Sequence, residues 1–164
     1  MGPAQIIEAR TDTEFVEAGT LFEEYAAAID VALCFQNFSH ELAHLPEMYS
    51  PPRGCLFIAR LEGALAGCVG IRALENDVCE MKRLYVRPAA RGQKLGRCLT
   101  LAAIEKGRAL GFVRMVLDTL ESMRSAQGLY RSLGFETITP YYGNPLDGVT
   151  YMELTLSNDR RSGG

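Results

Sequence analysis

The residues best suited to chemistry gather in one basic stretch of the chain. Between Lys82 and Arg97 the sequence has six lysines and arginines and no acidic residue. Within it, residues 91–96 read Arg-Gly-Gln-Lys-Leu-Gly and stand where a predicted strand ends and a predicted helix begins. A helix N-terminus offers unpaired N–H groups and the positive end of the helix dipole, and glycines let a phosphate approach the backbone. The stretch predicts a pyrophosphate-binding loop, although it matches neither the Walker A nor the Gly-x-Gly-x-x-Gly pattern.

A second pattern, His-Glu-x-x-His from His40 to His44, is typical of zinc peptidases, in which two imidazoles bind the metal and the glutamate activates water. A metzincin would continue with glycine and histidine where this chain has Glu47 and Ser50, and the whole sequence has two histidines. We therefore expect a chance match on a short polar helix and no metal site. A zinc metallopeptidase stays as the alternative enzyme class.

The elements that must position these residues follow from hydrophobic periodicity. The predicted strands are residues 55–60, 65–72, 79–86, 112–117, 135–139 and 149–156, with a Glu62-Gly63 turn between the first two and a short apolar run at Ile6 and Ile7 that could open the sheet. The predicted helices run from residues 11–14 to about Ile29, over a shorter stretch that ends near Leu45-Pro46, from Leu95 to a stop at Gly111, and from an N-cap at Ser122 to a C-cap at Gly134. This order predicts an α/β (α+β) fold with a mixed, mostly antiparallel sheet flanked by helices. We expect one domain over residues 1–157 and a disordered tail over residues 158–164.

Composition excludes several classes of protein. The chain has 164 residues, of which 48% are hydrophobic, and no apolar run long enough to cross a bilayer, so we expect one domain, no membrane partner and no secretion signal. Five cysteines without a Cys-x-x-Cys pair argue against a disulfide scaffold or zinc ribbon and favour a reducing cytoplasm. A net charge of −3 and few aromatic residues in the basic stretch argue against nucleic acid.

The net charge hides a division along the chain. Residues 1–80 carry 13 acidic and 4 basic side chains, whereas residues 81–164 carry 7 acidic and 13 basic ones. This division suggests an anionic ligand on the basic side and a cationic acceptor near Glu23, Glu24 and Asp30. Solvated surface charges explain the same acids equally well.

Three segments carry a family resemblance. Residues 80–88 read Glu-Met-Lys-Arg-Leu-Tyr-Val-Arg-Pro, residues 91–96 follow as the basic loop, and residues 126–135 read Ala-Gln-Gly-Leu-Tyr-Arg-Ser-Leu-Gly-Phe. In order and spacing the chain from Gly54 to Leu156 resembles the GNAT superfamily of acyl-CoA-dependent N-acyltransferases. The resemblance implies acetyl-CoA as co-substrate, with its pyrophosphate on the backbone amides of the loop and its pantetheine arm along the end of the preceding strand. The implied cofactor-binding residues are Leu84, Val86, Arg91, Gly92, Gln93, Lys94, Leu95, Gly96 and Arg97.

Two residues depart from the family pattern. Lys94 stands where the family has a glycine, and a lysine can serve there through its backbone N–H if its φ is negative. Met123 stands where many members place an asparagine seven residues before the tyrosine, so a polar contact from that position to the CoA arm is not expected.

Transfer of an acetyl group to an amine needs a neutral nucleophile, a stabilised oxyanion and a proton for the leaving thiolate. The resemblance implies that Tyr130 protonates the thiolate, and a core tyrosine is the alternative. Glu80 is the implied general base, and an ion-paired glutamate near Lys82 is nearly as good a reading. Strand parity puts Glu80 on the face of Leu84 and Val86 unless a bulge intervenes, and a backbone N–H near those two residues is the expected oxyanion donor. Covalent catalysis by Cys79 is a weaker idea, since no histidine is near it in sequence.

The sequence thus predicts an acetyltransferase that joins acetyl-CoA and a primary amine in a ternary complex. A non-catalytic CoA-binding module is a further alternative, and a homodimer would be unsurprising in the family. Segments in which the family varies are expected to line the acceptor site. Their candidate residues are Tyr25, Phe35, Gln36, Phe38, Tyr141, Tyr142 and Asn144.

Overall fold

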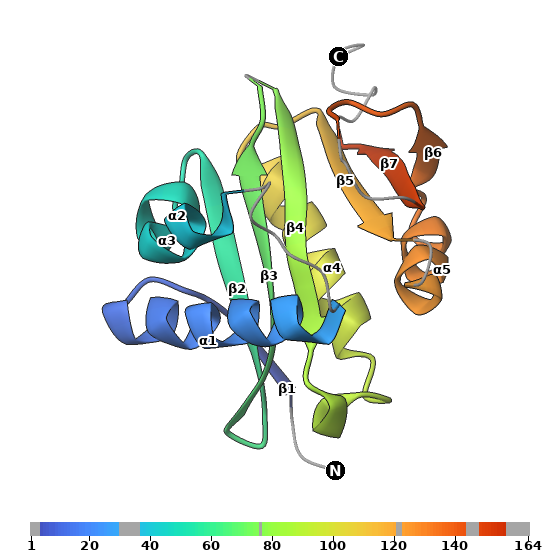
Figure 1. Ribbon diagram of the computed structural model, residues 1–164. Helices are drawn as coiled ribbons and strands as arrows, with labels where there is room; N and C mark the ends of the chain where they lie inside the picture. The colour runs from blue at the N-terminus through green and yellow to red at the C-terminus, as the bar shows by residue number, and fades with distance from the viewer. Residues whose placement is uncertain (1–3, 30–36, 76, 121–122, 144–147, 157–164) are drawn as a thin grey trace.

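The computed structural model describes residues 4–29, 37–75, 77–120, 123–143 and 148–156 (Figure 1). The expected tail at 158–164 lies outside these residues, as do Asp30, Phe35, Gln36, Ser122 and Asn144. The strands are β1 (Ala4–Glu8), β2 (Gly54–Leu61), β3 (Ala64–Ala73), β4 (Val78–Val86), β5 (Arg114–Leu120), β6 (Glu136–Ile138) and β7 (Val149–Thr155). The α-helices are α1 (Asp12–Ile29), α2 (Phe38–Ala43), α3 (Leu45–Met48), α4 (Leu95–Ala109) and α5 (Arg124–Ser132), and a 3-10 turn covers Pro88–Ala90.

The strands form one sheet in the order β1-β2-β3-β4-β5-β7-β6, in which β4 and β5 pair in parallel and the other described pairs are antiparallel. The segment β4-α4-β5 is a strand-helix-strand unit, in which helix α4 connects two parallel strands. The expected mixed, mostly antiparallel α/β sheet is confirmed. Among the described residues, none of the helices combines the length and apolar character that a membrane-spanning helix needs.

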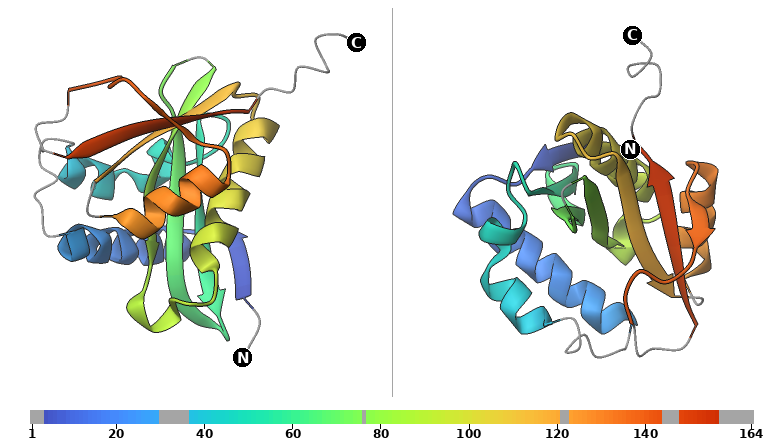
Figure 2. Two further views of the ribbon diagram at one scale, coloured as in Figure 1. Left: turned by 90° about the vertical axis from the view of Figure 1, so that its right-hand side faces the viewer. Right: turned by 90° about the horizontal axis from the view of Figure 1, so that it is seen from above.

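Two layers of helices cover the sheet (Figure 2). Helices α1 to α3 lie on one face, over a core that includes Phe22 and Tyr49. Helices α4 and α5 lie on the other face, where Leu99 and Tyr130 belong to a second, larger core. Each face of the central strands is therefore buried, which explains why β2 to β4 read as nearly continuous apolar runs.

Local chemistry fixes several ends of these elements. Thr11 Oγ1 accepts a hydrogen bond from the Glu14 N–H at 3.1 Å, and the Glu14 carboxylate accepts one from the Thr11 N–H at 3.0 Å, so a capping box starts α1. Glu62 and Gly63 have φ of 53° and 83°, as a two-residue hairpin turn requires. Both features confirm the sequence-based expectation.

Three expected boundaries are wrong in detail. Pro46 does not end the second helical stretch, because α2 ends at Ala43 and Pro46 sits in the first turn of α3, where its missing N–H costs nothing. The strand expected from Phe112 begins at Arg114, because the Phe112 N–H bonds to the Gly107 carbonyl and still belongs to the end of α4. The N-cap position of α5 is Met123.

A β-bulge interrupts β4. Cys68 pairs with Tyr85 and Gly70 with Lys82, so β4 has one more residue than β3 between these pairs, and Arg83 there has a φ of 64°. The bulge shifts the side-chain alternation. Leu84 and Val86 therefore pack into the core under α4 and α5, and Glu80 does not share their face.

Candidate functional site

The central opening of the sheet lies between β4 and β5. The two strands pair only from Val78 to Glu80 against Arg114 to Val116, yet β4 continues to Val86 and β5 to Leu120. Figure 1 shows them diverging beyond the paired residues. Past Glu80, the edge of β4 that faces β5 has no paired strand in the described part of the chain. The backbone of Leu84 and Val86 thus belongs to a segment where an extended ligand can pair with the sheet.

A small hollow of about 30 Å³ lies in this opening. Its lining comes from both strands, from α1 and from α5, and includes Leu84, Asp118 and Tyr130. Tyr130 is 6% exposed, and its ring lies 5.6 Å from that of Phe135. Burial raises the pKa of Tyr130, so its phenol keeps its proton at neutral pH. The structure therefore gives Tyr130 both a core contact and a position on the opening.

The basic loop lies at the N-terminus of α4. Gly92 has a φ of 87°, and a Cβ at this position would meet nothing within 4 Å. The first N–H groups of a helix have no partner inside it, and the N-cap residue Lys94 makes no side-chain capping bond. The loop thus presents backbone donors and the positive end of a 15-residue helix at an open surface. Arg91 and Arg97 are exposed, whereas Leu95 is buried.

The condition stated for Lys94, a negative φ, is not met. Its φ is 63°, in the left-handed region that a glycine adopts more readily. This conformation explains why glycine suits the position, and it changes the direction of the Lys94 N–H relative to a helical residue.

Three of the six bases of the stretch are engaged elsewhere, which corrects the expectation that all of them face a phosphate. Arg83 pairs with Glu41 at 2.8 Å, and Arg87 pairs with Glu24 at 2.8 Å. Lys82 lies 3.9 Å from Glu80. Lys82 and Arg83 both reach acids on the face of α1 to α3, because the bulge at Arg83 interrupts the alternation of β4.

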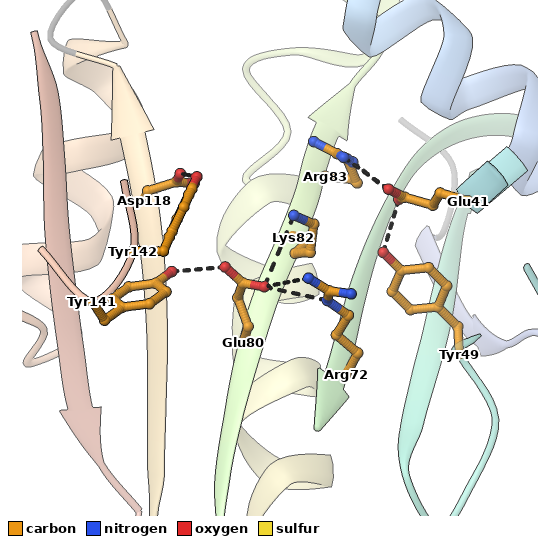
Figure 3. A network of polar contacts seen from close by, with 9 residues as sticks. All are labelled: Glu41, Tyr49, Arg72, Glu80, Lys82, Arg83, Asp118, Tyr141 and Tyr142. Atoms are coloured by element: carbon orange, nitrogen blue, oxygen red, sulfur yellow. Dashed lines mark hydrogen bonds and ion pairs between the residues drawn. The ribbon is translucent and has the colours of Figure 1, made fainter. Parts of the chain in front are cut away.

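Glu80 is the centre of a polar cluster on the face of α1 to α3 (Figure 3). Its Oε1 accepts hydrogen bonds from Arg72 Nε at 3.3 Å and Nη2 at 3.2 Å, and lies 3.9 Å from Lys82 Nζ. The Tyr141 hydroxyl donates to Oε2 at 2.8 Å. Glu80 is 3% exposed, so the ion-paired environment considered as an alternative is present.

A cavity of about 610 Å³ opens beside this cluster. Charged residues of β3, β4 and β5 line it, together with Leu74, Val78, Val116 and Ile138 and the tyrosines at 141 and 142. Lys82 lines both this cavity and the small hollow that Tyr130 lines. The two expected catalytic residues thus lie at different cavities that share one wall.

Arg72 belongs to the site although the sequence did not predict it, and Tyr142 makes a contact there that the sequence did not predict. Arg72 faces Glu80 because these residues are partners in the β3–β4 register, which no local pattern shows. The Tyr142 hydroxyl donates to Asp118, and the Tyr141 ring lies 5.2 Å from that of Tyr151. Tyr141 and Tyr142 therefore line the cavity as expected, but as members of a packed aromatic cluster.

Within the described part of the chain, the other expected acceptor residues are Tyr25 and Phe38, and both lie beside Arg83. Tyr25 also lines the small hollow that Tyr130 lines. Arg83 stacks over the rings of Tyr25 and Phe38, at 5.8 and 5.2 Å from the ring centres, and neither ring lines the larger cavity. Glu24 pairs with Arg87, and Glu23 lines a different surface groove, so the cationic-acceptor idea has no support from these acids.

The His-Glu-x-x-His segment folds differently from a zinc site. The rings of His40, exposed on α2, and His44, half-buried at the C-cap of α2, stack with their centres 4.1 Å apart. Glu41 points inward, where it accepts hydrogen bonds from Arg83 and Tyr49 and is 2% exposed. Its carboxylate is turned from the histidines and cannot activate a water between them. No group of three metal-binding side chains occurs in the described residues.

Cys79 is buried, and its burial raises the pKa of the thiol to about 12. Such a thiol is protonated near neutral pH and is a poor nucleophile, which argues against covalent catalysis.

Comparison with known proteins identifies the family. A family model for the acetyltransferase (GNAT) family matches residues 20–135. The chain belongs to the GNAT family. An uncharacterized N-acetyltransferase of Schizosaccharomyces pombe is 45% identical to this GNAT chain over 139 residues, which are 84% of this chain and 85% of that protein. The chain is thus an acetyltransferase.

Two less similar proteins extend the comparison. The N-acetylaspartate synthetase of Mus musculus is 31% identical over 142 residues, which are 84% of this chain and 48% of that protein, so the chain spans about half of its length. The structure of an acetyltransferase of Salmonella typhimurium with acetyl-CoA matches with a TM-score of 0.68 and 20% identity, and the match covers 95% of each chain. The latter match shows that the GNAT fold is shared.

Proposed function

We propose that the protein transfers an acetyl group from acetyl-CoA to a primary amine by direct attack in a ternary complex. The observation that carries the proposal is the opening between β4 and β5, which has a helix N-terminus near one end and the cavity of Glu80 at the other. Family membership supports it, because GNAT proteins use acetyl-CoA, and the Salmonella typhimurium neighbour holds this molecule.

The residues at the loop fit a pyrophosphate. Gly92 leaves its surroundings open, and a Cβ at Gly96 would meet only Leu129, at 3.8 Å, so phosphate oxygens can approach the backbone. We assign Arg91, Gly92, Gln93, Leu95, Gly96 and Arg97 to this contact. Lys94, whose positive φ turns its N–H, joins them through its ammonium group. Leu84 and Val86 would pair their backbone with the pantetheine arm at the unpaired edge of β4.

The chemistry divides between two side chains. Glu80 accepts the proton of the acceptor amine, directly or through water, as the amine nitrogen attacks the thioester carbonyl and the new C–N bond forms. A backbone N–H near Leu84 or Val86 stabilises the oxyanion. As the C–S bond breaks, Tyr130 donates its phenolic proton or a hydrogen bond to the sulfur. The raised pKa of Tyr130 keeps this proton in place before the reaction.

The class of amine that accepts the acetyl group is suggested by one relative. The mouse relative is named N-acetylaspartate synthetase, which makes an amine that also carries carboxylates one candidate class. A cytoplasmic location and a homodimer stay predictions from the sequence and the family.

Release of CoA from acetyl-CoA, separated by liquid chromatography, tests the proposal with a panel of amines, amino acids and peptides. We expect amine-dependent release, together with a thermal shift of roughly 5–10 °C at ligand concentrations about 100-fold above Kd. Binding without release would favour a non-catalytic CoA-binding module. If acetyl-CoA neither binds nor releases CoA with any acceptor, the proposal is refuted.

A further inference from the structure

The cavity beside Glu80 holds more positive than negative charge. Arg72, Lys82 and Arg114 line it, against Glu75 and Glu80. Arg114 and Glu75 are exposed, and Arg114 pairs with Glu153 at 2.7 Å. The inner charges are therefore those of Arg72, Lys82 and Glu80.

In this inner group one carboxylate faces two cations. Arg72 already makes two hydrogen bonds to Glu80 Oε1. Lys82 Nζ lies 3.9 Å from the same oxygen, which is beyond hydrogen-bond distance, and Tyr141 occupies Oε2. The negative charge of Glu80 is thus shared among three donors.

The positive charge of Lys82 is only weakly balanced by nearby carboxylates. Its side chain is 9% exposed, and in the described part of the chain Glu80 is its only ion-pair partner. The neighbouring base, Arg83, is neutralised by Glu41 on the other side of the bulge. Burial lowers the pKa of Lys82, and the nearby charges of Arg83 and Arg72 act in the same direction, against the attraction of Glu80 and Glu41. A buried cation next to an open cavity is stabilised by an anion that enters it.

Size and lining restrict this anion. The cavity of about 610 Å³ has apolar walls at Leu74, Val116 and Ile138, which suit the side chain of a small metabolite. Building on the proposed acetyl transfer, we infer that the acceptor is an amino acid or a similar small amine that carries a carboxylate. Its carboxylate binds Lys82 and Arg72, and its amine faces Glu80. Since Arg72 and Lys82 each lie within 4 Å of Glu80 Oε1, at 3.2 and 3.9 Å, the three side chains can receive the amine and the carboxylate of one α-carbon.

The test compares acceptors that differ only in this charge. The purified protein is supplied with acetyl-CoA and with pairs of L-amino acids and their amides, such as L-leucine and L-leucinamide, and with simple alkylamines. CoA release gives kcat/KM for each. We expect the acid of the best pair to exceed its amide by at least about tenfold, the effect of one hydrogen-bonded charge. The amide has the more easily deprotonated amine, so chemistry alone would favour the opposite order.

Variants locate the contact. In Lys82→Met the acid-to-amide ratio of kcat/KM falls by about tenfold or more, whatever happens to the absolute rates, and Lys82→Arg keeps most of the ratio. The matched control is Lys106→Met. Lys106 lies on α4 and pairs with Glu8 of β1 at 3.1 Å, away from the cavity, so its loss should leave the acid-to-amide ratio of kcat/KM as in the wild type. A purely structural role of Lys82 would lower both rates equally.

The possible outcomes distinguish a wrong acceptor class from a wrong proposed function. Equal or better use of amides and alkylamines would overturn the acceptor class but leave acetyl transfer standing. An unchanged ratio in Lys82→Met would overturn the assigned contact. Absence of CoA release with every acceptor would overturn the proposed function and this inference with it. If Lys82→Met does not fold, the wild-type preference for acid over amide decides alone.

Discussion

The buried ion pair between Glu41 and Arg83 gives the sharpest prediction about stability. Arg83 donates from Nη2 to Glu41 Oε1 at 2.8 Å and from Nε to Oε2 at 3.1 Å, and Tyr49 donates to Oε2 at 2.8 Å. Both charged side chains are 3% exposed. Glu41→Gln keeps the shape of the side chain but leaves the guanidinium buried without a counter-charge, so we expect a loss of about 3–5 kcal/mol in the free energy of unfolding. For a domain of this size the melting temperature should fall by roughly 6–20 °C.

The molecule contains its own control for this variant. Arg87 binds Glu24 with the same two-pronged geometry, at 3.0 and 2.8 Å, but both side chains are 34% exposed. Because water screens that pair, Glu24→Gln should cost only about 0–1 kcal/mol. Urea unfolding of both variants at pH 7, followed by circular dichroism, measures the difference. Equal losses would refute the argument that burial, rather than pairing itself, sets the cost.

The dependence on pH provides a second readout. Burial works to raise the pKa of Glu41, but the hydrogen bonds and charge of Arg83 outweigh it and hold the pKa below its usual 4.5. A carboxyl group whose pKa is lowered by folding adds stability above its unfolded pKa, and this contribution is lost as the pH falls through the folded value. The advantage of the wild type over Glu41→Gln should therefore be constant from about pH 5.5 to 8 and shrink below about pH 4.5. An advantage that grew on acidification would contradict the assigned sign.

Replacement of the whole pair tests whether the charges are needed at all. In Glu41→Leu with Arg83→Met, and with Tyr49→Phe to remove the orphaned hydroxyl, we expect stability to recover to near or above the wild-type value, since apolar replacements avoid the desolvation of both ions. If stability recovers but the affinity for acetyl-CoA falls, the pair serves to hold the bulge at Arg83. A triple variant as unstable as Glu41→Gln would instead show that the pair stabilises the fold in net terms.

Three further predictions concern the proposed site. Tyr130→Phe should lower kcat by at least about 100-fold with little change in acetyl-CoA affinity, and a full-rate variant would remove the general-acid role. Gly96→Val should fold, since a Cβ meets only Leu129 at 3.8 Å, yet weaken CoA binding by about tenfold in calorimetry, because the side chain blocks the approach to the backbone. Among the described cysteines, iodoacetamide at pH 8 should modify exposed Cys98 before buried Cys79, whose thiol has a pKa of about 12, and peptide mass spectrometry reads the order.

The sheet and helices were largely predictable because they rest on local chemistry. Apolar periodicity, the capping box at Thr11 and Glu14 and the turn at Glu62-Gly63 each act over a few residues, and the structure contains all of them. The bulge at Arg83 was not predictable in the same way. An extra residue in a strand leaves no mark in the alternation until the pairing with β3 is known.

In the candidate site, too, residues in local motifs were predictable and residues brought together by the fold were not. Glu80 and Tyr130 stand in motifs that a single sequence displays. Arg72 lies eight residues before Glu80 with a hairpin connection between them, and only the strand register makes them neighbours. Tyr141 reaches Glu80 across 61 residues of chain. Contacts made by register and by loop closure depend on the whole fold, so no spacing rule could assign them.

The division of charge along the chain also acquires a structural meaning. The acidic first half and the basic second half pair with each other: Glu8 with Lys106, Glu24 with Arg87, and Glu41 with Arg83. Part of the basic excess is thus neutralised within the molecule, by Glu8 of β1, Glu24 of α1 and Glu41 of α2, rather than by a ligand phosphate. Two groups of basic side chains are not neutralised by these pairs. The exposed bases of the loop at the start of α4 face solvent, and Lys82 faces a cavity with a carboxylate it must share. These two places lie at opposite ends of the β4–β5 opening, and we propose that the first binds a pyrophosphate and the second the carboxylate of an acceptor.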